Sequence, residues 1–148
     1  MGLNISNLYA LIHTVLREDE KIISLLGLPA NPTLTDTAMK IQKRLKPQNL
    51  VSENLPLISF YSNPGLIGNN YLEYTCAFDF DVYTGDDVEL ALAIVDRIQE
   101  LFDGEYPGLR CGTYFKARFN TCSEVDTDLQ NTYKFFVQIL FSLGLEEK

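Results

Sequence analysis

The sequence YLEYTCAFDFDVYT, residues 71–84, decides the fold of this chain. Apolar residues occupy every second position, and the positions between them include Glu73, Asp79 and Asp81. This period of two is typical of a β-strand with one face on the core and the other toward solvent or another subunit. We therefore expect this long strand to be the spine of an antiparallel sheet whose second face is acidic. The expected core face carries Leu72, Tyr74, Cys76, Phe78, Phe80 and Val82.

Two helices are expected ahead of the strands. Residues 4–17 place leucine, isoleucine and valine on one helical stripe, and residues 19–26 place isoleucine and leucine on another. One bent helix is the alternative. Gly27 is suited to end the second helix. His13 falls off the apolar stripe, so we expect it to be exposed to solvent.

Residues 33–47 have two interpretations. Their start resembles a helix cap and a short helix, or an irregular arm, whereas MKIQKRL also alternates as a strand does. Lys40, Lys43, Arg44 and Lys46 form a basic cluster here in an otherwise acidic chain. The cluster is either a solvated face or a surface that meets the acidic strand face of a neighbouring subunit.

The segment before the long strand is expected to be a short strand followed by a loop. Residues 57–62 alternate as a strand does. Residues 63–70, NPGLIGNN, are rich in turn-forming residues. Leu66 and Ile67 lie in the middle of that loop. They either fold back on the core or dock to a partner.

A helix and two strands complete the expected fold. The helix runs from Asp86 or Asp87 to Phe102, and its expected core stripe includes Val88 and Leu92. Strands at residues 111–122 and 132–143 are joined by an acidic loop that contains Glu124, Asp126 and Asp128. The expected fold class is therefore α+β, a four-stranded, mainly antiparallel sheet flanked by helices in the order α-α-β-β-α-β-β. Residues 1–148 are expected to form one domain.

Composition limits the class of partner. The 148 residues carry 12 Lys and Arg against 20 Asp and Glu, a formal charge of −8, so long-range electrostatics oppose binding to nucleic acid or anionic lipid. No apolar run is long enough for a bilayer, and no signal-peptide pattern starts the chain. The three cysteines have no CxxC spacing. We expect a reduced protein assembled in the cytoplasm.

The sequence lacks the common motifs of catalysis. It has no Walker loop, GxGxxG, HExxH, GxSxG or EF-hand spacing. Asp79 and Asp81 point the same way and fit either a carboxylate pair for a divalent ion or a solvated strand face. We expect no enzyme activity, no cofactor and no metal. A small metal-dependent enzyme is an alternative.

Several stretches resemble a known family. The element order, together with LPLISFY, the glycine-rich turn, AFDFDVYTGDD, IVDRIQELFDG and NTYKFFVQILFSL, is similar to the head–tail joining proteins of tailed bacteriophages, above all the tail-terminator or tail-completion group. The resemblance runs from about Ile41 to Leu143. It concerns hydrophobic pattern and element order, and no catalytic residue transfers because the family has none.

The resemblance implies a structural virion protein that forms a hexameric ring, caps the tail tube and joins it to the head connector. DNA would pass through an acidic lumen without sequence-specific binding. A neck or head-completion component and a host-directed binding module are alternatives. Candidate subunit-interface residues are Lys40, Lys43, Arg44, Lys46, Glu73, Asp79 and Asp81, and candidate partner-binding residues are Leu66, Ile67, Glu124, Asp126 and Asp128.

Overall fold

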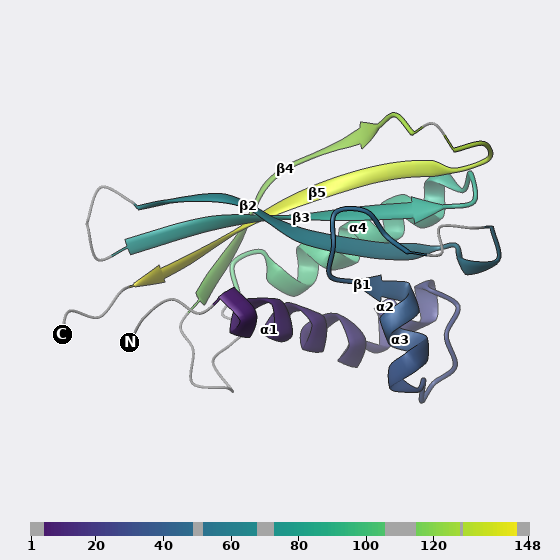
Figure 1. The fold of residues 1–148 in the computed structure, drawn as a ribbon, viewed down its shortest axis with the longest axis horizontal. Helices are drawn as coiled ribbons and strands as arrows, with labels where there is room; N and C mark the ends of the chain where they lie inside the picture. Colours follow the sequence, from purple (N-terminus) through teal and green to yellow (C-terminus); the bar gives the residue numbers. More distant parts are fainter. Residues whose placement is uncertain (1–4, 49–51, 68–72, 106–114, 128, 145–148) are drawn as a thin grey trace.

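This computed structural model describes residues 5–48, 52–67, 73–105, 115–127 and 129–144. One mixed sheet of five strands organises this part of the chain. The strand order is β1-β2-β3-β5-β4. The long strands run along the molecule, and α1 and α4 run alongside them (Figure 1). The elements are α1 Ile5–Glu18, α2 Glu20–Leu25, α3 Leu34–Lys40, β1 Ile41–Gln42, a 3₁₀ turn Ser52–Asn54, β2 Leu57–Ile67, β3 Glu73–Thr84, α4 Val88–Phe102, β4 Phe115–Val125 and β5 Tyr133–Gly144.

The α+β class is confirmed, whereas the strand count of four was wrong by one. The fifth strand is β1, which pairs in parallel with β2 through Ile41 and Ile58. Both interpretations of residues 33–47 hold in part. The Thr33 hydroxyl accepts from the Asp36 N–H and caps α3, which then passes directly into β1. A two-residue strand is too short to leave a period in the sequence.

The expected loop at residues 63–70 is in part strand. β2 continues to Ile67, where Leu66 and Ile67 pair with Thr75 and Tyr74 of β3. Between Asn63 and Leu66 the strand gains one residue relative to β3, which is a β-bulge. The bulge lets the ladder continue past a proline and a glycine that otherwise indicate a turn.

The core lies between the helices and one face of the sheet. Phe78 and Phe80 are fully buried there, which confirms the predicted inner face of the long strand. Their rings lie in a chain of aromatic contacts: the centroids of Phe60 and Phe80 are 5.6 Å apart, and those of Phe78 and Phe141 are 5.5 Å apart. Such pairs add to the free energy gained from burial alone.

Helix α4 supplies much of the cover over the sheet. The Asp87 carboxylate accepts from the Leu90 N–H and caps the start, and Gly104 follows the end with a φ of 78° that suits glycine. Its buried residues are Ala91, Ile94, Val95, Ile98 and Phe102. Val88 and Leu92, expected on the core stripe, are exposed, because Val88 is the first helical residue and Leu92 lies about 100° around the axis from Ala91.

Candidate assembly surfaces

Lys40 belongs to the internal structure and not to a free basic cluster. Its ammonium group donates to the carbonyl oxygens of Asn54 at 3.0 Å and Pro56 at 3.2 Å. Burial lowers the pKa of this lysine. Lys40 therefore ties α3 to the segment that enters β2.

The remaining basic residues lie on an exposed loop, residues 43–46, which we call the basic loop. The Gln42 side chain closes it: its amide accepts from the Gln48 N–H at 2.6 Å and donates to the Gln48 carbonyl at 2.8 Å. The Ser59 hydroxyl of β2 donates to the Arg44 carbonyl. The loop is thus held at both ends and pinned near its middle, with its side chains turned outward.

The acidic strand face contains a hydrogen-bonded row across three strands. The Gln138 amide of β5 donates to Asp79 of β3 at 2.9 Å, and the Asn120 amide of β4 donates to Gln138 at 2.5 Å. Asp79 is half-buried in this row. The Asp79 carboxylate therefore already accepts a hydrogen bond within the subunit, which meets part of its capacity as an acceptor.

Asp81 is buried, so the expectation of a solvated second face was wrong at this residue. Its exposed fraction is 1%, and its Oδ2 atom has no hydrogen-bond partner among the described residues. The Lys134 ammonium lies 3.6 Å from Oδ2 and 5.3 Å from the centre of the Tyr83 ring. Burial raises the pKa of Asp81 more than Lys134 and the Tyr61 hydrogen bond lower it.

The groups beside Asp81 come from both neighbouring strands: Tyr61 belongs to β2 and Lys134 to β5. Ser59 of β2 is the cross-strand neighbour of Asp81, and its hydroxyl donates to the Arg44 carbonyl. The basic loop is therefore bonded to the strand beside Asp81 within the same subunit. The contact uses the loop backbone and leaves the charged side chains outside.

Other predicted residues are placed less completely. Glu124 is exposed on β4 and Asp126 is exposed just after it, whereas Asp128 lies outside the described residues. Leu66 and Ile67 of β2 and Glu73 of β3 are placed in strands, but their side chains lie outside the description. The interface and partner roles of these residues stay predictions.

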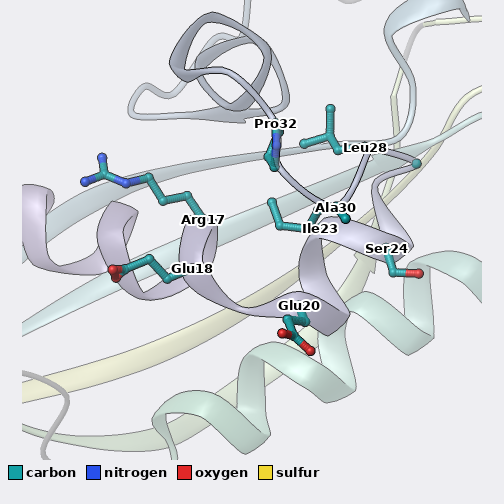
Figure 2. A pocket seen from close by; sticks show the side chains of 9 residues that line it. Arg17, Glu18, Glu20, Ile23, Ser24, Leu28, Ala30 and Pro32 are labelled. Atoms are coloured by element: carbon teal, nitrogen blue, oxygen red, sulfur yellow. The ribbon is translucent and has the colours of Figure 1, made fainter.

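A groove that sequence reasoning missed opens between α1, α2 and the loop that leads into α3 (Figure 2). Its volume is about 590 Å³, and a second hollow of about 570 Å³ shares several of its residues and extends to Leu34. Figure 2 shows the side chains of Ile23, Leu28 and Pro32 close together, with Arg17 and Glu18 at the α1 end. The prolines of this loop were the available signal. They could not show which helices the loop would face.

His13 is buried rather than exposed, with an exposed fraction of 8%. Its Nε2 atom lies 3.0 Å from the Ile41 carbonyl, and its Nδ1 atom lies 3.4 Å from the Arg17 guanidinium. A carbonyl only accepts and a guanidinium only donates, so the neutral ring carries its proton on Nε2. Burial is the main cause that lowers the pKa of His13. The histidine ties α1 to β1.

The described residues contain neither a candidate metal site nor a candidate membrane-spanning helix. No group of three or more histidine, cysteine, aspartate or glutamate side chains within that part of the chain could hold a metal ion. No helix in the same residues is long and apolar enough to cross a membrane.

Comparison with known proteins gives a match in fold. No family model and no curated protein sequence matches the chain. Among solved structures, a chain of the virion of a native gene transfer agent particle superposes with a TM-score of 0.63 and 12% sequence identity. The match covers 93% of this chain and 94% of that chain. The fold described above is therefore similar to that of a chain from a gene transfer agent virion.

Proposed function

We propose that this protein is a structural subunit of a phage-like virion, and more narrowly a tail terminator. The observation that carries the proposal is the similarity in fold to the gene transfer agent chain over nearly the full length of both chains. The resemblance of the sequence to head–tail joining proteins supports the narrower role. Both lead to a subunit whose work is assembly rather than chemistry.

The proposed mechanism is passive. A ring of subunits, expected to be hexameric, occupies the end of the growing tail tube with a surface that tube subunits bind but cannot extend, and offers its other side to the head connector. The formal charge of −8 disfavours contacts that neutralise phosphates, so DNA would pass the ring without being held. No catalytic step is required.

Partner contacts are proposed at the ends of the sheet. Leu66 and Ile67 end β2 at one end, and Glu124 and Asp126 lie where β4 ends at the other. Loops at these positions can change without disturbing the buried aromatic residues of the core. The exposed residues of the basic loop are the proposed subunit interface.

Deleting the gene from its phage and imaging the lysate tests the proposal. Loss of a terminator leaves overlong tails that are not attached to filled heads, and supplying the wild-type gene from a plasmid restores normal tails. Tails of normal length beside heads that leak DNA would instead assign the protein to the neck. Infectious particles of normal appearance would refute a structural role in the virion.

A further inference from the structure

The basic loop carries an exposed apolar residue among its charges. Leu45 has an exposed fraction of 57%, and Lys43, Arg44 and Lys46 surround it in the sequence. Because Gln42 and Ser59 hold the loop backbone, little conformational entropy is lost when a partner binds it. The loop therefore has the form of a fixed apolar anchor with a positive rim.

The groove has the complementary form. Its apolar lining is Ile23, Leu28 and Pro32, and the neighbouring hollow ends at Leu34, which is 74% exposed. Two exposed carboxylates, Glu18 and Glu20, belong to the lining of both hollows. A leucine side chain flanked by lysines would bury apolar surface here and place its charges beside carboxylates.

We propose that the basic loop of one subunit inserts Leu45 into this groove on the next copy of the chain. The proposal rests on the assembly proposed above and names the contact that builds it. It replaces pairing of the basic cluster with Asp81, because that carboxylate is buried within its own subunit beside Lys134. The occupant of the groove is thus a second copy of this chain.

The basic loop and the groove lie at different places on the subunit. The basic loop is bonded to β2 at Ser59, whose side chain faces away from the helical core, while the groove opens among α1, α2 and the loop before α3 (Figures 1 and 2). Two different patches on one subunit give a heterologous contact, which closes into a ring when the rotation per subunit divides a full turn.

Arg17 sets the orientation of the inserted loop. Its guanidinium lies at the α1 end of the groove beside His13 and has the same sign of charge as the loop. Lys43 and Lys46 must therefore approach from the side of Glu18 and Glu20. A loop of opposite charge would prefer the Arg17 end.

Reciprocal charge reversal tests the contact. Lys43→Glu with Lys46→Glu alters the loop, and Glu18→Lys with Glu20→Lys alters the groove. By native mass spectrometry and sedimentation, each pair should weaken self-association by roughly tenfold or more, and the four changes together should restore it largely. Arg118→Glu, an exposed charge on β4, is the control that should leave association unchanged.

A second comparison uses exposed leucines and does not depend on charge. Leu45→Ala should weaken association by roughly tenfold, whereas Leu129→Ala, which truncates a leucine exposed in the loop between β4 and β5, should not. Circular dichroism and thermal melts establish that each variant is folded. If a charge-reversed variant unfolds, the two leucine variants decide.

Three results would overturn the contact. These are a wild-type chain that stays monomeric at every concentration, variants that assemble as the wild type does, and a fourfold variant that fails to recover although each pair weakens assembly. Tight binding of the groove to a different virion protein, with self-association unchanged, would also overturn it. The gene-deletion experiment measures tail length and does not depend on which residues form the contact between subunits. Failure of this contact is therefore distinguishable from failure of the proposed function.

Discussion

Asp81 is a buried carboxylate whose ion-pair partner among the described residues is Lys134. Lys134 lies 3.6 Å away and retains some exposure to solvent, whereas Asp81 is almost fully covered. Removing the cation leaves a buried charge without compensation, which costs more than removing the carboxylate. We expect Lys134→Met to lower the free energy of unfolding at pH 7 by about 3 kcal/mol, measured by urea denaturation.

The pH dependence of this variant separates charge from packing. The pKa of Asp81 is raised by burial, so its neutral form favours folding, and that contribution is complete below about pH 3.8 and is lost as pH rises through the raised pKa. The deficit of Lys134→Met should therefore shrink as pH falls. Asp81→Asn is the control and should cost clearly less at pH 7. Equal losses in the two variants would rule out the buried charge as the cause.

Phe80 tests the assignment of the inner sheet face. Its ring is fully buried, 5.6 Å from the Phe60 ring and 5.5 Å from the Phe102 ring. Phe80→Ala should reduce the free energy of unfolding by roughly 3–5 kcal/mol, because the cavity is lined by stiff aromatic neighbours. Leu92→Ala on the exposed side of α4 should cost less than about 1 kcal/mol. Wild-type stability of Phe80→Ala would show that the faces are reversed.

At the scale of elements, Asp19 joins two helices. Its carboxylate accepts from the Ile22 N–H and so caps α2, and it accepts from Arg97 of α4 at 2.9 and 2.5 Å. The Arg97 hydrogen bond lowers the pKa of Asp19. One side chain therefore fixes both the start of α2 and its position on α4.

Two substitutions separate these roles. Asn is as good a cap as Asp but has no charge, so Asp19→Asn should lose only the ion pair, about 0.5–1 kcal/mol. Asp19→Ala loses the cap as well and should cost about 2 kcal/mol in total. Chemical denaturation of both variants, with Arg97→Met for comparison, measures the difference. If Asp19→Ala and Asp19→Asn are equally stable, the cap contributes nothing.

Elements with a local cause could be predicted from the sequence, and those with a distant cause could not. Asp87 and Gly104 bound α4 through their own backbone and side-chain preferences, and the alternation of residues 73–84 fixes β3. By contrast, β1 exists because it finds an edge of β2, and the end of β2 depends on a bulge opposite β3. Such pairings leave little trace in either segment alone.

At the scale of the whole molecule, the same limit applies to the candidate surfaces. Lys43, Arg44 and Lys46 are exposed, which agrees with both alternatives that the sequence left open for the basic cluster. The burial of Asp81 was not predicted, because the groups beside it, Tyr61 and Lys134, belong to other strands and are distant in the sequence. The groove likewise joins residues 17–24 to residues 27–34 through a loop geometry that prolines indicate but do not define.

Acid should destabilise the fold in two separate ranges of pH. The pKa of His13 lies below its ordinary value of 6.5, so the unfolded chain binds the proton more readily, and each unit of that depression lowers stability by about 1.4 kcal/mol as pH falls past 6.5. The pKa of Asp19 lies below 3.8, so its contribution is present above that pH and is lost below it.

The upper range can be assigned by substitution. His13→Gln keeps a donor toward the Ile41 carbonyl but does not titrate, so its unfolding free energy should stay level from pH 7.5 to pH 5 where that of the wild type declines. Thermal melts across this range measure the difference. A parallel decline in both proteins would assign the loss to other groups.

The turn after α4 affects how the edge strand β4 can pair with strands of other molecules. Its Gly104 N–H donates to the Ala117 carbonyl, its Glu105 carbonyl accepts from the Ala117 N–H, and the Asp103 carboxylate accepts from the Phe119 N–H. These backbone groups of Ala117 and Phe119 lie in the first half of β4, the edge strand of the sheet. An incoming strand finds them occupied, so this half of the edge is protected against pairing with a strand of another molecule.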